Sequence, residues 1–271
     1  MLEWTEGIDI SKWQDAPDTT KNIDLGKAYE QGARFVMVRA GIGKKADRNF
    51  EYARQNAKDN NMLWGSYWYF NFEFTPAYQA NKYIETMRGD YGNLPMAIDI
   101  EKPLPPKSQK DWFLDQCKSF VDFIEEPMER TALIYSNPSF FRYYVGYSNV
   151  PFWMTQRDLW IAHYLSKPPF YIVHEPNPDP SKRSPNYKPW PAYKIWQYSD
   201  RGDGIAHGME SKQVDRNYFN GSLEELKKYA NVQEPQPIPV PPDDPPDKPA
   251  MIYQGQMLSE DSHYSVWWEP L

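Results

Sequence analysis

The sequence predicts an α/β fold, an irregular TIM-like β/α barrel of parallel strands with helices sparse in its second half. Short apolar runs rich in β-branched and aromatic residues alternate with helical stretches, a pattern typical of parallel sheets with right-handed crossovers. Eight such runs fall within about 230 residues, a spacing typical of a closed barrel. The chain of 271 residues is long enough for one barrel and an appendage.

The runs expected to form strands are short, as buried barrel strands are. They are Gly7–Ile10, Phe35–Ala40, Leu63–Phe70, Met96–Ile100, Ala132–Ser136, Leu159–Tyr164, Tyr193–Tyr198 and a run around Val214. Helices are expected between the earlier strands, at Leu25–Gln31, Asn49–Asn61, Pro76–Arg88 and Gln109–Glu125. The third helix has the clearest start, because Thr75 is a favourable N-cap and Pro76 suits the first helical position.

A long connection, Ser166–Ala192, separates the sixth and seventh predicted strands. It is rich in proline and shows little hydrophobic periodicity, and long loops of this kind in compact domains are usually functional. Because the connection follows a strand, we expect it to rise over one end of the barrel.

The composition changes sharply after residue 231, so residues 1–231 are predicted to form the barrel domain. Eight of the 26 prolines fall in residues 232–249, which are predicted to be a semi-rigid proline-rich linker. Residues 250–271 are a tail too short to fold alone, and we expect it to pack on the barrel, dock on a protein partner or stay disordered. The tail is rich in aromatic residues: Tyr253, Tyr264, Trp267 and Trp268.

Charge and hydropathy exclude several classes of protein. The formal net charge is −7, from 30 basic and 37 acidic residues, so a basic face for nucleic acid is not expected. Apolar runs are all far shorter than a membrane-spanning helix, and no membrane insertion is expected. The first ten residues have neither the basic region nor the apolar core of a secretory signal, so no signal peptide is predicted.

Cysteine and histidine patterns give no sign of a metal site or a cofactor site. The single cysteine, Cys117, lies on an apolar helical stripe with Phe113 and Phe120, which is typical of a buried core thiol. The four histidines are scattered and form no HxxxH or HxH pair. We therefore predict no metal and no cofactor.

Four acidic residues interrupt apolar strands near their expected carboxyl-terminal ends. Asp99 and Glu101 are two apart in MAIDIE, so they share a strand face with Cα atoms about 6.5 Å apart. Asp9 lies in GIDIS, and Asp215 in VDRN near the end of the last predicted strand. Carboxyls this close raise one another's pKa, which is useful for acid catalysis near neutral pH. In barrel enzymes this end of the strands holds the active site.

Four motifs occur in a specific order along the chain: GIDISKWQ, GSYWYF, AIDIE, and IWQYSDRG followed by VDRNYF. Together they resemble the glycoside hydrolase family 25 lysozymes over about residues 5–230. The resemblance implies an irregular β/α barrel that cleaves the β-1,4 bond between N-acetylmuramic acid and N-acetylglucosamine in bacterial peptidoglycan. It also implies that Glu101 is the general acid and that Asp99 orients the substrate N-acetyl group or stabilises an oxocarbenium-like centre. Asp9 and Asp215 resemble the flanking acids.

Aromatic residues make up 16% of the chain, an excess that favours a carbohydrate protein because sugar rings stack on flat apolar surfaces. The candidates for sugar binding at the strand ends are Tyr67, Tyr69, Tyr135, Trp160, Tyr164, Trp196 and Gln197. Core packing explains each aromatic side chain equally well. Two carboxyls on one strand supply no opposed nucleophile, so assistance by the substrate acetamido group is favoured, with retention or inversion left open.

Two other functions stay open on the sequence alone. One is a non-catalytic carbohydrate-binding or structural phage protein on the same barrel, although the presence of all four acids argues against it. The other is a hydrolase of a different N-acetylhexosamine polymer, such as chitin. The family includes phage endolysins and bacterial autolysins. We therefore expect action on the bacterial cell wall, after release by a lysis machinery or from a phage particle.

Overall fold

The computed structural model describes residues 3–15, 22–165 and 177–231. Its strands follow the predicted order, with bounds that differ by a few residues. The strands are β1 (Thr5–Ile10), β2 (Phe35–Ile42), β3 (Lys45–Ala46), β4 (Leu63–Tyr69), β5 (Ala97–Asp99), β6 (Leu133–Ser136), β7 (Leu159–Ala162), β8 (Ile195–Asp203) and β9 (Gln213–Phe219).

The helices are concentrated in the first half of the barrel, as predicted. They are α1 (Leu25–Glu30), α2 (Phe50–Asp59), α3 (Pro76–Met87), α4 (Lys110–Met128), α5 (Phe152–Thr155) and α6 (Leu223–Tyr229). A π-helical segment, η3 (Phe140–Val145), follows β6, and short 3-10 turns occur at Lys12–Gln14, Lys107–Gln109 and Tyr147–Asn149. The helix α6 was not expected, although Ser222 and Glu225 form a capping box at its start.

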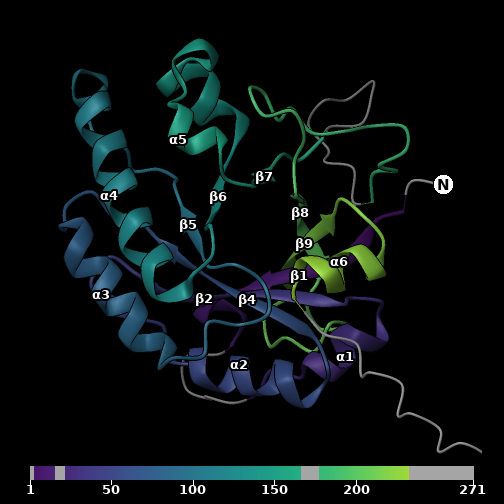
Figure 1. The fold of residues 1–271 in the computed structure, drawn as a ribbon. Coiled ribbons are helices and arrows are strands. Elements are labelled where there is room, and N and C mark those ends of the chain that lie inside the picture. Colours follow the sequence, from purple (N-terminus) through teal and green to yellow (C-terminus); the bar gives the residue numbers. More distant parts are fainter. Residues whose placement is uncertain (1–2, 16–21, 166–176, 232–271) are drawn as a thin grey trace, which may run out of the picture. The chain divides into compact units, whose positions relative to one another are not determined.

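The described strands form one sheet in the order β1-β9-β8-β7-β6-β5-β4-β2-β3, and β1 also pairs with β2 (Figure 1). This last pairing closes the sheet into a barrel of eight strands, which β3 extends beyond β2. The predicted α/β barrel is therefore confirmed. We call the end of the barrel where the parallel strands finish the mouth.

One strand departs from the prediction of parallel strands. β9 runs antiparallel to both of its neighbours, β8 and β1, whereas the other neighbouring pairs of the barrel are parallel. Asp215 therefore lies near the start of β9, directly opposite Asp9 of β1, and not near the end of a parallel strand. A reversed strand begins where its parallel neighbours finish, so Asp215 still reaches the mouth.

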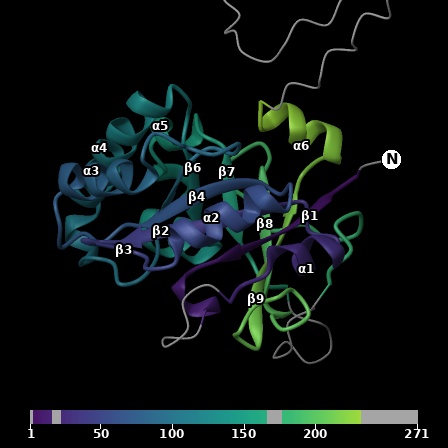
Figure 2. The same cartoon turned by 90° about the horizontal axis from the view of Figure 1, so that it is seen from below.

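Alternation of side chains across the strands divides the core into two layers. The inner layer fills the barrel, and α6 closes its far end by packing Leu226 against that layer. The outer layer lies between the strands and helices α2, α3 and α4, which follow the outside of the barrel in Figures 1 and 2. Cys117 of α4 is buried in this outer layer, so the predicted core thiol is confirmed.

Three of the predicted segments lie wholly or partly outside the described residues. They are the linker at 232–249, the tail at 250–271, and residues 166–176 of the long connection. None of the described helices combines the length and the apolar character that crossing a membrane requires.

Candidate active site

Asp99 and Glu101 form a carboxyl pair at the end of β5. Ile100 between them packs in the outer core, and its N–H donates to the carbonyl oxygen of Tyr135 at 3.0 Å. The backbone therefore stays extended past the strand end, and both carboxyls face the inside of the barrel. Asp99 is 3% exposed and shares a hydrogen bond with the Glu101 side chain.

The environment of this pair favours a retained proton. Burial, and then the Glu101 charge, raise the pKa of Asp99 well above its usual value. Burial also raises the pKa of Glu101, and the hydrogen bond with Asp99 opposes that increase. A hydrogen bond between two carboxyls requires a proton, so the pair holds one proton to a higher pH than isolated carboxyls do.

Asp9 is held by two amide side chains from β8 and β9. Gln197 Nε2 donates to Asp9 Oδ2 at 2.7 Å, and Asn217 Nδ2 donates to the same oxygen at 2.8 Å. Asp9 is 3% exposed, and its burial raises its pKa to about 6, although the two amide hydrogen bonds oppose the change. Asp9 therefore has a fixed orientation and a pKa close to neutral.

A second set of hydrogen bonds fixes which way these two amides face. Trp160 Nε1 donates to Asn217 Oδ1 at 2.8 Å. The hydroxyls of Tyr135 and Tyr164 donate to Gln197 Oε1 at 2.9 and 2.6 Å. The indole N–H can only donate, so the NH2 group of Asn217 must point at Asp9, and the two hydroxyl donors favour the same orientation for Gln197. These residues form a positioning network for one carboxylate.

Arg39 of β2 is a site residue that the sequence analysis missed. It is 8% exposed and donates from Nε and Nη2 to the two carboxylate oxygens of Asp47, at 2.9 and 3.3 Å. Its positive charge lowers the pKa of Asp99, against the effect of burial. The available signal was an arginine in the middle of the apolar run FVMVRAG.

The predicted sugar-binding aromatic residues fall into three groups. Tyr67, Tyr135 and Trp160 are less than 9% exposed and pack edge to face inside the barrel, with ring centroids 4.5–5.6 Å apart. These rings pack in the inner core, and Tyr135 also lines the second of the two pockets described below. Tyr69 and Tyr164 are half-buried at the mouth, where a substrate can reach them.

The structure does not bring Trp196 to the mouth. Adjacent residues of a strand face opposite sides, so Gln197 points into the barrel and Trp196 points out of it. Trp196 is fully buried against Tyr193 and Tyr198 in the outer core, and its Nε1 donates to the carbonyl oxygen of His163 at 2.9 Å. We therefore no longer assign Trp196 to the substrate.

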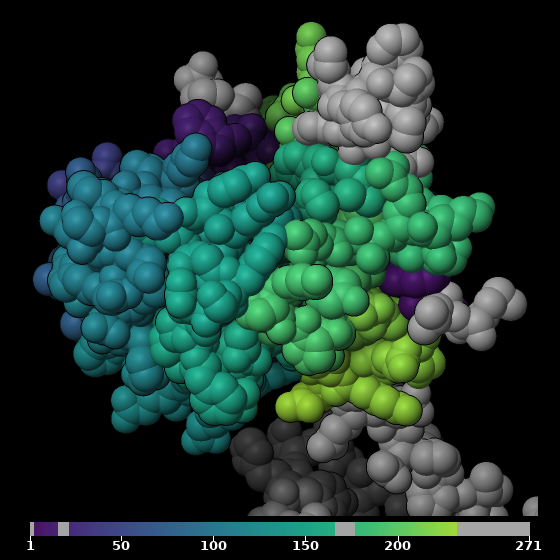
Figure 3. Space-filling model, turned by 90° about the horizontal axis from the view of Figure 1, so that it is seen from above, coloured from purple at the N-terminus to yellow at the C-terminus, as the bar shows by residue number. Residues whose placement is uncertain are grey.

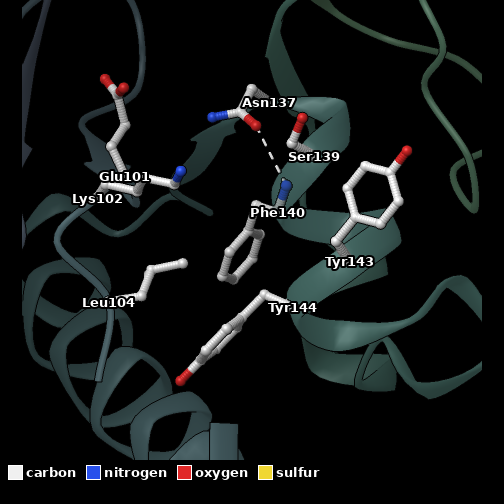
Figure 4. Close-up of a pocket in the computed structure, with 8 residues that line it drawn as sticks. All are labelled: Glu101, Lys102, Leu104, Asn137, Ser139, Phe140, Tyr143 and Tyr144. Carbon is white, nitrogen blue, oxygen red and sulfur yellow. Dashed lines mark hydrogen bonds between the residues drawn. The ribbon is translucent and has the colours of Figure 1, made fainter. Parts of the chain in front are cut away.

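Two pockets of about 610 Å³ each meet at Glu101. The first also has the lining residues Lys102, Leu104, Asn137, Ser139, Phe140, Tyr143 and Tyr144 (Figure 4). The second shares Glu101, Asn137, Ser139 and Tyr143 with the first and extends to Arg142, Tyr147, His163, Tyr164 and Asn186. Figure 3 shows the teal and green segments of the second half of the barrel side by side on this face. Both volumes lie in the range of small-ligand sites.

Asn137 stands between these pockets and was also missed from the sequence. It follows β6, and its Oδ1 accepts a hydrogen bond from the N–H of Phe140 at 3.1 Å. In Figure 4 its amide nitrogen points toward the side of the pocket on which Glu101 lies. Asn137 can therefore offer hydrogen-bond donors beside the carboxyl pair.

Replacing Asp215 with asparagine should stabilise the protein at neutral pH. Burial and the neighbouring Asp9 raise the pKa of Asp215 well above its usual value. The folded state thus binds more protons than the unfolded state, and stability falls as the pH rises above about 4. Asp215→Asn removes this cost, so we expect a melting temperature about 3–6 °C higher at pH 7, and a smaller gain at pH 5.

Asp115→Asn is the matched control, because it makes the same chemical substitution at an exposed position on α4. A lower melting temperature for Asp215→Asn than for this control at pH 7 would contradict the electrostatic interpretation.

The comparisons with known proteins agree with this geometry. A family model for glycosyl hydrolases family 25 matches residues 8–205, a range that includes Asp9, Asp99 and Glu101. An N,O-diacetylmuramidase of Chalaropsis sp is 28% identical over 241 residues, with 83% of this chain and 98% of that protein covered. Lysozyme M1 of Streptomyces globisporus is 27% identical over 233 residues, with 83% and 71% covered.

A solved structure of a muramidase from Acremonium alcalophilum has a TM-score of 0.62 and 25% sequence identity. The superposition covers 84% of this chain and all of that one. The family match spans most of the barrel and three of the four acids. The chain therefore belongs to glycosyl hydrolases family 25 and is a glycoside hydrolase.

Proposed function

We propose that this protein hydrolyses bacterial peptidoglycan at the β-1,4 bond between N-acetylmuramic acid and N-acetylglucosamine. The observation that carries the proposal is the buried Asp99–Glu101 pair, which lies where two sugar-sized pockets meet. The relatives named muramidase and lysozyme support this substrate class.

Glu101 is the general acid in this proposal. It is the member of the pair that lines both pockets, so it can reach the oxygen of a glycosidic bond that crosses between them. Burial raises its pKa, which keeps the carboxyl protonated at a pH where a free glutamate is ionised. Transfer of that proton to the leaving oxygen lowers the barrier to bond cleavage.

Asp99 is the group that orients the substrate acetamido group. Its Oδ1 is buried and, among the described residues, accepts no hydrogen bond. A buried carboxyl oxygen of this kind is costly unless a donor pairs with it. The N–H of an N-acetyl group is a suitable donor, and a hydrogen bond from it would act with the Arg39 charge to favour the ionised form of Asp99. The negative charge of Asp99 would then stabilise the positive charge that develops on the sugar.

The geometry also favours acetamido assistance over a covalent enzyme intermediate. In a retaining glycosidase with an enzyme nucleophile, the two carboxyls face each other across the bond, about 5–5.5 Å apart. Asp99 and Glu101 instead lie two residues apart on one face at the end of β5, with Ile100 between them in the outer core, so both lie on the same side of the bond. The substrate's own acetamido oxygen would then attack the anomeric carbon while Glu101 protonates the leaving group.

The remaining residues have supporting roles in the proposal. Asp9, with its pKa of about 6, adds negative charge near the developing cation, and a hydrogen bond from Asp215 favours its ionised form. Arg39 favours the ionised form of Asp99. Tyr69 and Tyr164 are the aromatic side chains at the mouth that we assign to sugar contact. The chain would act on the bacterial cell wall, with glycan as its partner.

The test is to digest purified peptidoglycan, reduce the new chain ends with borohydride and identify the amino alcohol after acid hydrolysis. Cleavage after N-acetylmuramic acid yields muramitol, and this is the expected product. Glucosaminitol would place the cut at the other bond, and no new reducing ends would overturn the proposal. Digestion of chitin in parallel distinguishes a hydrolase of another N-acetylhexosamine polymer.

Replacing Gln197 with glutamate should slow catalysis without removing any of the four acids. The Oε1 position can still accept from Tyr135 and Tyr164, but the group facing Asp9 loses its N–H donors. Loss of that hydrogen bond should raise the pKa of Asp9 further, and the Asp9 carboxyl should no longer be held in one orientation. We expect kcat to fall by about tenfold to a hundredfold with little change in KM.

Gln31→Glu, at an exposed position on the barrel exterior, is the matched control, and it should leave both constants unchanged. If Gln197→Glu keeps the wild-type kcat and pH profile, the positioning network has no role in turnover.

A further inference from the structure

Arg142 is an exposed cation in the lining of the second pocket. It belongs to η3, which is anchored by its buried residues Phe140, Phe141 and Val145. The Arg142 guanidinium lies over the ring of Tyr143, with Cζ 5.0 Å from the ring centroid. Among the residues that the structure describes, no carboxylate forms an ion pair with it.

Apart from Glu101, the polar side chains that line the pocket with Arg142 are uncharged. His163 Nδ1 accepts from the N–H of Asn186 at 3.0 Å, so its proton is on Nε2. Burial and the charge of Arg183 lower the pKa of His163, which keeps the ring uncharged at neutral pH. Asn186 Nδ2 donates to the hydroxyl of Tyr147 at 2.7 Å. Arg142 is therefore the positive charge of this pocket's described lining.

The two sides of Glu101 differ in chemistry. Apart from the residues that both pockets share, the first pocket is lined by Leu104, Phe140, Tyr144 and Lys102, so its own walls are more apolar than those of the second (Figure 4). The second pocket is polar and contains Arg142. A glycan whose two alternating sugars differ in charge would bind in one orientation across such a boundary.

The positive charge of Arg142 can offset the repulsion between the protein and an anionic substrate. Four carboxyls meet at the mouth, and the whole chain has a formal net charge of −7, so an anionic substrate is repelled on approach. The guanidinium lies over the ring of Tyr143, a contact that favours this position, and among the described residues no carboxylate pairs with its N–H groups. A planar guanidinium with a free edge is suited to bidentate binding of a carboxylate.

We propose that Arg142 is a specificity-determining residue that binds a carboxylate on the lactyl–peptide substituent of the glycan and so places the substituted sugar in the polar pocket. This inference rests on the proposed function. It adds two claims to that function. The anionic substituent lies on the side of the bond that faces the polar pocket, and Arg142 is the side chain that selects it.

The experiment compares two soluble glycans of the same length. One is peptidoglycan glycan with its peptide stems, and the other is the same material with its carboxyls converted to neutral amides by carbodiimide and methylamine. Arg142→Gln should lower kcat/KM on the anionic glycan by about fivefold to tenfold, mainly through KM, because the contact is solvent-exposed. On the amidated glycan the variant should match the wild type within about twofold. Arg142→Lys should restore only part of the loss, because lysine cannot bind bidentately.

Two further variants separate a specific contact from general charge. Arg88→Gln removes the same charge from the end of α3, at the far end of the barrel, and should leave both substrates unaffected. Lys102→Gln removes the cation of the other pocket, and it should change the ratio of the two rates by less than about twofold.

An equal loss for Arg142→Gln on both glycans, at an unchanged melting temperature, would overturn the inference. The inference would also be overturned if Lys102→Gln changed the ratio of the rates on the two glycans as much as Arg142→Gln does. Any nearby positive charge would then be enough to favour the anionic glycan. Failure of the proposed function itself has a different signature, since the wild type would then cleave neither glycan.

Discussion

Replacing Glu101 with glutamine should reduce turnover on peptidoglycan by about 10²–10⁴-fold. Glutamine has the same shape and fits the same half-buried position between the pockets, but it has no proton to give to the leaving oxygen. Substrate binding should persist, so KM should change little. Turnover of the variant, measured as new reducing ends per enzyme, is the direct readout.

The wild-type pH profile provides a second readout for Glu101. Because burial raises the pKa of Glu101, the protonated and active form persists toward neutral pH. Activity should then fall as the pH rises through that pKa, and this alkaline limb should be absent from the residual activity of Glu101→Gln. Glu85→Gln on the exposed surface of α3 is the matched control. More than about a tenth of wild-type turnover in Glu101→Gln would refute the assignment.

Replacing Asp99 with asparagine is expected to have the second large effect, a loss of about 10²-fold or more in kcat. The change removes the negative charge beneath the developing cation. It also replaces an acceptor by an amide whose orientation toward the substrate N–H is no longer assured. The amide introduced at this position can still donate to Glu101, so the fold of the loop after β5 should be kept.

The pH profile of Asp99→Asn should not move to higher pH. Asparagine carries no charge at any pH, and its amide can donate to Glu101 in place of the hydrogen bond by which Asp99 lowers the pKa of Glu101. The alkaline limb of the residual activity should therefore lie at the same pH as in the wild type or at a lower one. The melting temperature should be equal or higher, because one member of a buried acid pair is gone. An alkaline limb at higher pH would contradict the arrangement of the pair.

The sequence was sufficient to predict the barrel and its four acids, for a physical reason. A carboxylate inside an apolar strand is costly, so Asp9, Asp99 and Glu101 stand out from the runs that contain them. The direction of β9 could not be predicted, because an apolar run has the same pattern in either direction. The position of Asp215 at the mouth was therefore correct, although the expected strand direction was not.

Contacts between strands were beyond prediction. Asn217 and Arg39 acquire their roles from partners on other strands, and no local pattern identifies those partners. Trp196 shows a different limit: it and Gln197 are neighbours in one strand, so only one of them can face the barrel interior. Strand alternation alone could have excluded one of the two, but register was needed to decide which.

The reversal of β9 also determines where the polypeptide leaves the barrel. A final parallel strand would have ended among the carboxyls, and the chain would have departed beside the substrate. Instead β9 runs away from the mouth, and after α6 the residues Ala230 and Asn231 lie next to Gly89 and Asn93 at the opposite pole. The exit of the barrel domain is thus kept apart from a long polymer that threads past Glu101. For the same reason, an enzyme engineer could cut or fuse the protein at this pole without crowding the cleavage point.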